Sequence, residues 1–581
     1  MDGKQGKQYA LKSQLLGRNL LLGSGTEVSN PYYNIAKYWF TEQIPVGTQV
    51  TVTIWAELGE NCEGFVLFNS GGNVPIDGKR QDVGQSVVDI VNGKGQTTVN
   101  WAIENSYNDY TASNTYLSVF TRPFGGSNNS VSTIHKIKLE YGDISTDWTP
   151  AWEDIPDLEQ RYAYGVEWDM ASSSPDGVRV GNMQLHRELP VQSKMRRVTI
   201  DNNGGITNNS PNSDDVTDGS NSNVMDHSMM TEIPEHWFKL VQHGTKFRMM
   251  LSEIPLPGYK HIDKFYVSTN EARIDRNTNT LIASGSPNSA NAEYRGGDNT
   301  AEWDGTYRSL LGRPVTNLTR DQFRQAARKK GSGWEMYTYN AHKTLFWLFA
   351  VEYATLNSQK PFNAQKDANG FAQGGLGEGA TLMTNWSAFN NTNPLIPCGY
   401  TNEFGNGSGE RAYVVKDADG NTVATLMANR YRGIENPFGH IWKYCDGANV
   451  QVTTGDSGLS ILFTTDDPSN FSDTSYTGYD KKGNICRTNG YAKKMLLGED
   501  GDIVATEVGG SSSTYWCDYY RIYTSANRMQ VLLVGSNAVD GSLAGLAYVD
   551  TAYAPSDAAR SIGSRLCFFP KYKSTNITTQ S

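Results

Sequence analysis

The stretch VLLVGSNAVDGSLAGLAYVDTAYAPSDAARSIGSRLCF, Val531 to Phe568, decides how the second half of this sequence is interpreted. It opens with the aliphatic run Val531 to Val534, which is typical of a β-strand, and it closes on the apolar run Leu566 to Phe568. The residues between them are mostly Gly, Ala, Ser, Asp and Tyr, with little helical or strand period. A loop this long inside a compact domain is uncommon and is usually functional or disordered. The choice between the two depends on the fold around it.

The composition predicts several β-rich domains. The chain has 581 residues, of which 11% are aromatic and 58 are glycine, so it is too aromatic for a disordered chain. Its net charge of −10 gives no basic footprint of a nucleic-acid-binding protein. No apolar run has the length of a membrane span, and the N-terminal MDGKQGKQYALKSQ lacks the apolar core of a signal peptide. We therefore expect no nucleic-acid partner, no membrane insertion, and release by cell lysis, for example within a virus particle.

The cysteines predict no metal site. They form no CxxC pair and are widely spaced, which favours buried free thiols over zinc ligation. A disulfide among the last five stays open, because the sequence does not assign a pairing. The six residues are Cys62, Cys398, Cys445, Cys486, Cys517 and Cys567.

Four segments are predicted along the chain. Residues 1–16 are polar, carry no fold signal and are interpreted as a tether to whatever precedes them. Residues 17–152 contain short apolar–polar alternations such as QVTVTIWAEL, EGFVLFNSGG and IHKIKLEYG, which predict a β-sandwich or jelly roll. Residues 153–230 predict a linker and a β-hairpin or oligomerisation element, with a polar loop at 201–224. Residues 231–581 form the larger domain.

The larger domain is predicted to be α+β, with two helices on a small sheet and long loops. The first helix starts at TRDQFRQAARKK, where Thr319 and Gln322 form a capping box. The second spans about 340 to 355 and is apolar nearly all round, which predicts deep burial. The phrases EHWFKLVQHGTKFRMMLSE and HIDKFYVSTNEARID alternate like an antiparallel pair.

The N-terminal sandwich resembles the carbohydrate-binding-module-like jelly rolls of phage tail and tail-fibre proteins. The resemblance rests on RNLLLGSG and on the closing phrase IHKIKLEYGDISTDWTPAWED. It implies that Tyr32, Tyr33, Trp39 and Trp55 can stack on sugar rings, whereas the alternative, which we favour for any single one of them, is that they fill the sandwich core.

The second half resembles the C-type-lectin fold of formylglycine-generating-enzyme-like domains. The residues that carry the resemblance are FWLFAVEYATLNSQ, PLIPCGYTNEFGNGSGE and, most specifically, RYRGIENPFGHIWKYCDG, Arg430 to Gly447. Within that fold the chain looks most like the variable proteins of diversity-generating retroelements, including tropism determinants of phages and prophages of gut Bacteroidales. The resemblance implies a receptor-binding protein, assembled as a homotrimer, on the virion tail.

The enzymes of this fold have motifs that this sequence does not match. Their cysteine pair has no counterpart around Cys517 and Cys567, and no His pattern suits an iron-dependent oxygenase. There is no nucleophile elbow or P-loop, and Gly374 to Gly379 is interpreted as a set of turn glycines. Glu435-Asn436-Pro437 has the residue types of a lectin calcium loop in the wrong order, so a structural turn is favoured over a metal site. We expect no catalytic residue, no cofactor and no metal.

The resemblance assigns residues 515–568 to a segment diversified by adenine-directed mutagenesis. Val531 to Gly535 and Ala544 to Ala547 are interpreted as scaffold, and the mixed residues around them as ligand-binding, because Tyr gives large contact area at low entropic cost. The alternative is an ordinary Gly/Ala loop over the core. The predicted ligand-binding residues are Tyr519, Tyr520, Arg521, Tyr523, Asn537, Val539, Asp540, Leu543, Tyr548, Asp550, Tyr553, Asp557 and Arg560.

Three functions follow as hypotheses. The first is a phage tail receptor-binding protein that attaches to a surface protein or glycan of a bacterial host. The second is an enzyme, either formylglycine-generating-like or a tail-associated glycan hydrolase, which needs two carboxylates at a defined separation. The third is a bacterial surface adhesin, against which the missing signal peptide argues.

Overall fold

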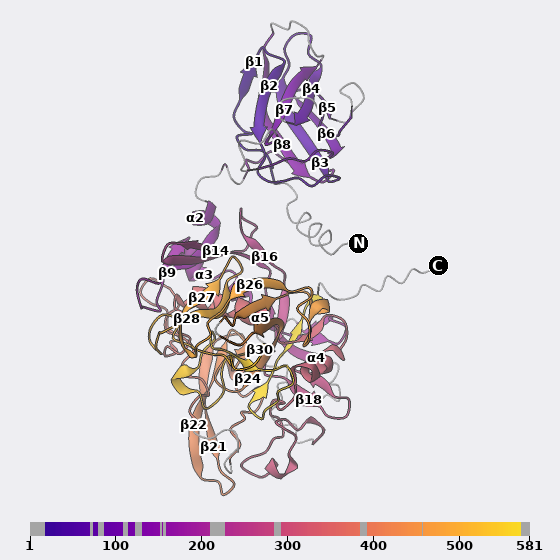
Figure 1. Cartoon of the computed structure of the whole chain (residues 1–581). Coiled ribbons are helices and arrows are strands. Elements are labelled where there is room, and N and C mark those ends of the chain that lie inside the picture. Colours follow the sequence, from indigo (N-terminus) through magenta and orange to yellow (C-terminus); the bar gives the residue numbers. More distant parts are fainter. Residues whose placement is uncertain are drawn as a thin grey trace, which may run out of the picture. The chain divides into compact units, whose positions relative to one another are not determined.

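The computed structural model shows a multidomain, mostly β protein (Figure 1). It describes residues 18–69, 74–79, 86–107, 114–122, 130–151, 154, 158–208, 227–283, 292–383, 392–455 and 457–570. The predicted tether and most of the polar loop at 201–224 lie outside these residues. Contacts divide the chain into two compact units, Met1–Leu158 with Pro255–Pro257, and Glu159–Ile254 with Gly258–Ser581.

The first unit consists of two four-stranded antiparallel sheets around one core. The core contains aliphatic and aromatic side chains from both sheets, including Val52, Leu67, Leu117 and Ile137. One sheet has the order β1 (Val28–Asn30), β8 (Ser132–Tyr141), β3 (Gln49–Glu57), β6 (Lys94–Asn100). The other has the order β2 (Asn34–Trp39), β7 (Tyr116–Arg122), β4 (Gly64–Asn69), β5 (Val87–Asp89). Alternation along each strand places every second side chain in this core.

None of the four aromatic residues proposed for sugar stacking belongs to the sandwich core. Tyr32, Tyr33 and Trp39 are exposed, and Trp55 is half-buried, with the ammonium groups of Lys94 and Lys136 over its ring. The expectation that each fills the sandwich core is therefore wrong. Tyr32 and Tyr33 lie on the loop before β2, and Trp39 is an exposed residue at the end of β2. Trp55 points away from the core because it alternates with the core residues Ile54 and Ala56 along β3.

The phrase that closes the first unit folds back on its own last strand. Lys138 and Glu140 of β8 are buried, with Nζ of Lys138 lying 3.5 Å from a carboxylate oxygen of Glu140. Lys138 donates to the Thr146 hydroxyl at 2.5 Å and to the Asp147 carbonyl at 2.8 Å. Glu140 accepts from the Thr146 amide at 2.9 Å, and the Trp148 indole donates to a carbonyl of β8. The buried ion pair is therefore satisfied by the segment that it holds in place.

The second unit contains larger sheets than the sequence predicts. A nine-stranded sheet runs β26 (Asp480–Asn484), β25 (Ser460–Thr464), β24 (Trp442–Val452), β30 (Arg528–Val534), β31 (Val549–Tyr553), β29 (Tyr519–Arg521), β27 (Gly490–Leu497), β28 (Asp502–Val508), with β32 (Ile562–Gly563) on β24. A six-stranded sheet runs β12 (Ile206–Asn208), β11 (Arg196–Asp201), β13 (His227–Ile233), β17 (Phe265–Ser268), β33 (Leu566–Phe568), β20 (Trp334–Met336). The prediction of one small sheet is wrong, because short strands from distant parts of the sequence join in these sheets.

Residues 159–230 belong to the second unit. A five-stranded sheet runs β10 (Val178–Gly181), β9 (Ala163–Asp169), β15 (Lys246–Ser252), β14 (His236–His243), β16 (Lys260–Ile262). Here β9 pairs with β15 along its whole length, and β11 pairs with β13. The boundary expected at residue 231 therefore does not separate two compact units. The first alternating phrase is itself the β14–β15 hairpin, whereas the second phrase divides among three sheets.

Two smaller sheets complete the second unit. One is the pair β18 (Arg273–Asp275) and β19 (Thr280–Ile282). The other is the hairpin of β21 (Gly409–Lys416) and β22 (Thr422–Tyr431) with the short β23 (Ile434–Glu435), and Figure 1 shows this hairpin projecting from the rest of the unit.

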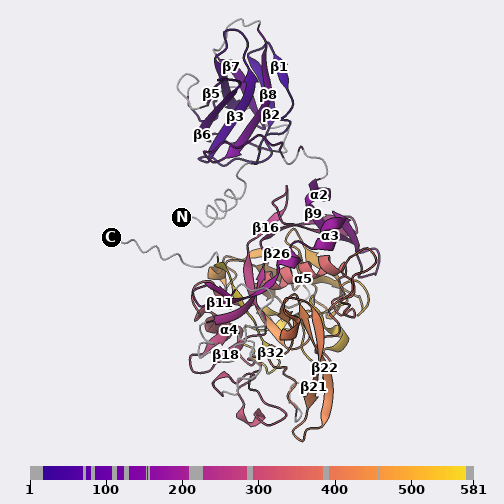
Figure 2. The ribbon, with the colours of Figure 1, turned by 180° about the vertical axis from the view of Figure 1, so that it is seen from behind.

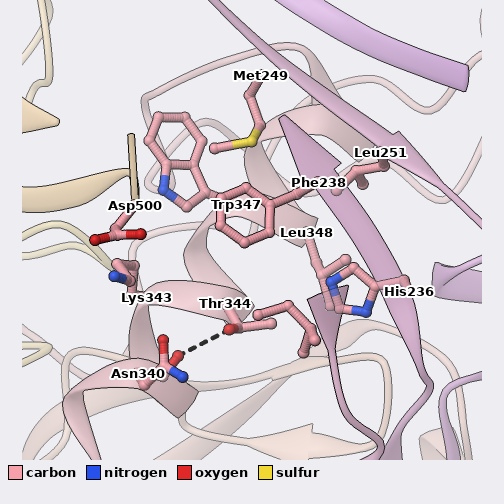
Figure 3. Close-up of a pocket in the computed structure, with 11 residues that line it drawn as sticks. His236, Phe238, Met249, Leu251, Asn340, Lys343, Thr344, Trp347, Leu348 and Asp500 are labelled. Atoms are coloured by element: carbon pink, nitrogen blue, oxygen red, sulfur yellow. Dashed lines mark hydrogen bonds between the residues drawn. The ribbon is translucent and has the colours of Figure 1, made fainter. Parts of the chain in front are cut away.

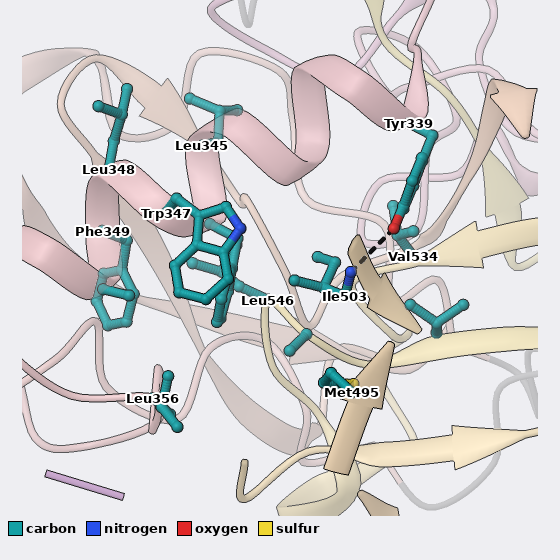
Figure 4. Close-up of a cluster of buried hydrophobic side chains, with 14 of the residues drawn as sticks. Tyr339, Leu345, Trp347, Leu348, Phe349, Leu356, Met495, Ile503, Val534 and Leu546 are labelled. Atoms are coloured by element: carbon teal, nitrogen blue, oxygen red, sulfur yellow. Dashed lines mark hydrogen bonds between the residues drawn. The ribbon is translucent and has the colours of Figure 1, made fainter. Parts of the chain in front are cut away.

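The two predicted helices are present. In α4 (Arg320–Arg328) the Thr319 side chain accepts from the Gln322 amide and the Gln322 side chain accepts from the Thr319 amide, so the capping box is confirmed. Helix α5 (Tyr339–Tyr353) is buried over nearly its whole surface and lies in the middle of the unit in both views (Figure 2). Figure 4 shows Trp347 and Leu348 of α5 in the same cluster as Ile503 and Leu546. Shorter helices are α2 (Leu158–Tyr162) and α3 (Met183–Glu188).

The block Arg430 to Gly447 holds a neighbouring loop. Arg430 and Glu435 are opposite each other in the β22–β23 pair. The Glu435 carboxylate accepts from the amides of Gly399 and Thr401 at 2.8 and 2.6 Å, and Arg430 donates to the Thr401 hydroxyl and to the Gly405 carbonyl. Asn436 has a positive φ of 43°, as expected for a tight turn. The interpretation of Glu435-Asn436-Pro437 as a structural turn is therefore confirmed.

Candidate functional site

The loop from Gly535 to Tyr548 is an ordered part of the core surface. It leaves the nine-stranded sheet at the end of β30 and returns to it in β31, which pairs antiparallel with β30 and parallel with β29. The amides of Leu546 and Ala547 donate to the Ser358 hydroxyl at 3.0 Å and to the Asp518 carboxylate at 2.7 Å. Ala544 to Ala547 are buried. The interpretation of this run as scaffold is therefore confirmed. The loop lacks a helical or strand period because hydrogen bonds hold its backbone in turns.

Four of the predicted ligand-binding residues are buried. Tyr520 donates to the Cys486 carbonyl at 2.9 Å and belongs to the main core. Tyr548 packs edge-to-face on Trp442, with ring centroids 4.7 Å apart. Asn537 accepts from the Val539 amide at 3.1 Å, as a turn residue. Asp550 is fully buried in β31. The prediction of direct ligand contact is wrong for these four, because strand and turn geometry turns them inward.

The exposed members come from three separate segments. Tyr523 is 42% exposed and Val539 is 41% exposed. Arg521 is exposed, and Tyr519, Asp540, Leu543 and Tyr553 are half-buried. We call these seven residues the ligand face: Tyr519, Arg521, Tyr523, Val539, Asp540, Leu543 and Tyr553.

Short-range contacts connect the ligand face to its buried support. Tyr519 packs edge-to-face on Tyr548 and on Tyr491, with centroids 5.8 and 5.4 Å away. The Tyr491 hydroxyl lies 3.2 Å from the Ser542 hydroxyl. Tyr491 and Ser542 are therefore neighbours of this face that the sequence analysis did not include. Tyr491 sits in a different hairpin, so only the pairing of β27 with β29 brings it here.

Two carboxyl groups of this region have raised pKa values. Burial raises the pKa of Asp550 to about 7, and the nearby Asp540 adds to it, whereas the Ala552 amide and Arg521 oppose the shift. Burial likewise raises the pKa of Asp540 to about 6 against the Asn537 amide and Arg521. Arg521 lies 3.8 Å from Asp550. The exposed guanidinium of Arg521 therefore favours the ionised form of both carboxyl groups.

Asp518 is a third buried carboxyl group, which the sequence analysis missed. It accepts from the Ala547 amide through one oxygen, and its other oxygen has no hydrogen-bond partner. Burial raises its pKa well above the ordinary value. A Cβ atom on Gly545 would lie 2.0 Å from this second oxygen, so only glycine fits there. Asp518 thus supports the scaffold from beneath.

The last two predicted residues have structural partners. Asp557 accepts from the Ala554 amide at 2.8 Å. Arg560 forms an ion pair with Asp298 at 2.6 Å, and Asp298 is almost buried. Asp557 and Arg560 are both half-buried. These contacts hold the chain between β31 and β32.

The cysteines, His440 and the glycine run 374–379 have structural roles in the described residues. All six cysteines are free, and burial raises the pKa of Cys567 to about 12 and that of Cys517 further, so neither thiol ionises readily. His440 pairs with the Glu271 carboxylate at 2.5 Å and accepts from the Ile396 amide, so it is a buried structural residue. Gly374, Gly377 and Gly379 have positive φ, as turn glycines do.

The described residues contain no group of three or more His, Cys, Asp or Glu that could hold a metal ion. They also contain no helix that is both long and apolar enough to cross a membrane.

Comparison with known proteins gives little. No family model matches the chain, and no curated protein matches it. Among solved structures, PvdO from Pseudomonas aeruginosa aligns over 59% of this chain and 94% of that protein, at 11% identity and a TM-score of 0.24. A similarity at this TM-score supports no inference about fold or function.

Proposed function

We propose that this protein is the receptor-binding protein of a phage tail and attaches to a surface protein or glycan of a bacterial host. The observation that carries the proposal is the ligand face, whose exposed and half-buried residues come from three segments, next to the buried run Ala544 to Ala547 in the same loop. Such a division lets contact residues change while the fold stays fixed. In its finer form the proposal includes a jelly roll, a C-type-lectin fold and diversification of residues 515–568.

The proposal also includes the oligomeric state of the protein and its location on the virion. A single face of mixed Tyr, Arg and Asp side chains binds weakly, and a homotrimer on the virion tail multiplies its affinity. The N-terminal tether joins other tail proteins, and the protein acts without a cofactor or catalytic residue. Light scattering of the purified full chain measures the assembly directly, and a monomer at micromolar concentration would contradict the trimer.

Competition for phage adsorption tests the function. Soluble protein is added to host cells before the phage, and free phage is counted. We expect the unaltered chain to inhibit adsorption and the Tyr523→Ala/Val539→Asp double variant to inhibit at least about tenfold less, since a tenfold change corresponds to about 1.4 kcal/mol. The control is Tyr162→Ala/Val178→Asp, whose parent residues are similarly exposed outside the face. Equal inhibition by both variants would exclude this face.

One observation favours the enzyme hypothesis instead. Asp540 and Asp550 are neighbouring carboxyl groups with raised pKa values, which is the environment of a general acid. Release of reducing sugar from host surface glycan, lost in Asp540→Asn, would favour a glycan-degrading enzyme. We expect no release, because Asp550 is fully buried and cannot contact a substrate.

A further inference from the structure

Two cavities of the second unit differ in size and polarity. The cavity between α5 and the five-stranded sheet has a volume of only about 20 Å³, which is room for about one water molecule, beside apolar side chains such as Phe238, Met249 and Leu348 (Figure 3). The other cavity has a volume of about 450 Å³, which is within the usual range of small-molecule pockets, and it opens to solvent. We call the second cavity the arginine pocket. Of the two, it is the one with room for a small molecule.

The arginine pocket lies where one end of the six-stranded sheet meets the turn between β22 and β23. Arg196 begins β11 and lies opposite Glu232 of β13, and both follow the short helix η2 (Gln192–Lys194) along the chain. Arg432 lies in the turn itself. The polar lining consists of Ser193, Lys194, Arg196, Glu232, Asn406 and Arg432.

Hydrogen bonds fix the loop that contributes Asn406 to the pocket. The Arg197 amide of β11 donates to the Asn406 side chain at 2.9 Å, and the Arg432 amide donates to the Ser408 hydroxyl at 3.1 Å. Arg432 also has a positive φ of 45°, which is uncommon for a residue other than glycine. The loop is therefore tied both to the sheet and to the turn, so a ligand meets walls that are already in place.

The lining of the pocket carries more positive than negative charge. Three of its six polar residues are cations, and one, Glu232, is a carboxylate. Lys194 and Arg432 form ion pairs with Glu253 and Glu352, but neither of these two carboxylates lines the pocket. An anion in the pocket therefore meets the cations directly.

Two guanidinium groups of the lining keep donors for a ligand. Arg432 donates to the Glu352 carboxylate through Nε and Nη2 at 2.6 to 3.1 Å, which leaves Nη1 without a hydrogen-bond partner among the described residues. Arg196 is more loosely paired, because its Nη2 lies 3.5 Å from the Glu232 carboxylate and its side chain is partly exposed. The planar donors of a guanidinium match the two oxygens of a carboxylate.

We propose that the arginine pocket binds a small hydroxylated carboxylate, the chemical class of the uronic acids. The carboxylate accepts from Arg196 and Arg432, and a hydroxyl group of the ligand binds the Ser193 hydroxyl. An apolar ligand gains little there, because Met195, the apolar residue of the lining, is almost fully buried. The pocket shares no residue with the ligand face, so this site goes beyond the proposed receptor attachment.

Binding of D-glucuronate to the full chain tests the proposal. Ligand-observed NMR titrations compare D-glucuronate with D-glucose and D-glucosamine, which keep the sugar ring but are neutral and positively charged. We expect D-glucuronate to bind at least about tenfold more tightly than either, and its affinity to fall as the NaCl concentration rises, because salt screens the attraction. Absence of saturable D-glucuronate binding at tens of millimolar, or equal affinity for the three sugars, would overturn the proposal.

Two substitutions with opposite effects locate the site. Arg196→Gln removes a guanidinium from the lining, and we expect D-glucuronate to bind at least about tenfold more weakly, as expected for a lost hydrogen bond between charged groups. Glu232→Gln removes the carboxylate of the lining and keeps an acceptor for the Tyr266 hydroxyl, so we expect binding to tighten by about threefold. Unchanged affinity in both variants, with normal thermal transitions, would place the sugar elsewhere.

Matched controls separate this site from general charge effects and from the ligand face. Arg411→Gln is the charge control, because Arg411 also lies 3.5 Å from a carboxylate, that of Glu403, at similar exposure, but does not line the pocket. We expect it to bind D-glucuronate as the unaltered chain does, and a loss equal to that of Arg196→Gln would contradict the assignment. The Tyr523→Ala/Val539→Asp variant should also retain D-glucuronate binding.

Discussion

At the scale of residues, exposure divides the C-terminal segment into contact and support. Tyr, Arg and Asp side chains alternate there with Gly and Ala, and the sequence alone does not say which of them face solvent. The structure turns Tyr548 and Asp550 inward and leaves Arg521 and Tyr523 outside. Turning Asp550 inward has an energetic consequence. A buried carboxyl group is less well solvated when it is ionised, so burial favours its protonated form.

Asp550 should make the stability of the second unit depend on pH. Its folded pKa of about 7 is above the ordinary 3.8, so its contribution to stability is fully present below about pH 4 and is lost as pH rises toward 7. We expect Asp550→Asn to flatten the unfolding free energy between pH 4 and 7, by roughly 2–4 kcal/mol. Denaturant unfolding at several pH values measures it. Asp419→Asn, at an exposed turn, is the control, and an unchanged slope in Asp550→Asn would contradict the burial of this carboxyl group.

Asp518 gives a second test of a buried carboxyl group. Its pKa is raised well above the ordinary value by burial, so ionising it at pH 7 opposes folding. Asp518→Asn keeps the shape and the acceptor for the Ala547 amide without the charge. We expect the thermal midpoint at pH 7.5 to rise relative to the unaltered chain, and the difference to shrink at pH 4. A lower midpoint at both pH values would mean that Asp518 has a charged partner.

At the scale of elements, local signals determined the helices. Thr319 and Gln322 cap α4 through hydrogen bonds between residues three positions apart. Glu435, in contrast, accepts from the amides of Gly399 and Thr401, which are 36 and 34 positions away. The closing phrase of the first unit is held locally, since Lys138 and Glu140 bind residues only six to nine positions ahead. Sheet membership was harder to predict, because strand partners such as β17 and β33 are far apart in sequence.

The α4 cap should be measurable. Thr319→Ala removes the acceptor for the Gln322 amide, and we expect a loss of about 1 kcal/mol in the unfolding free energy of the second unit. Chemical denaturation of the full chain measures the loss. Thr474→Ala, on an exposed loop, is the control and should change stability by less than about 0.5 kcal/mol.

The Lys138–Glu140 pair predicts non-additive changes in the first unit. Lys138→Met leaves the Glu140 carboxylate buried without its partner, and we expect a loss of about 3–5 kcal/mol. Lys138→Met combined with Glu140→Leu should lose less than Lys138→Met alone, because no uncompensated charge stays buried. A double-mutant cycle measures the coupling, and simple additivity would contradict the role assigned to the pair.

At the scale of the whole molecule, two separate cores predict two unfolding transitions. The core of the first unit and the main core of the second share no residue. In calorimetry of the full chain, Lys138→Met should lower one transition and Thr319→Ala the other. A single transition moved by both substitutions would mean that the two units unfold cooperatively.

The sequence by itself determined the β-rich, multidomain character and the two main helices, because hydrophobic period and helix capping act over a few residues. That the six cysteines are free was decided by the tertiary structure. Only the tertiary structure decided that residues 159–230 join the second unit, that Tyr491 adjoins the ligand face, and that Asp550 is buried. These depend on long-range strand pairing, in which each partner is chosen by the packing of the whole core and not by its neighbours along the chain.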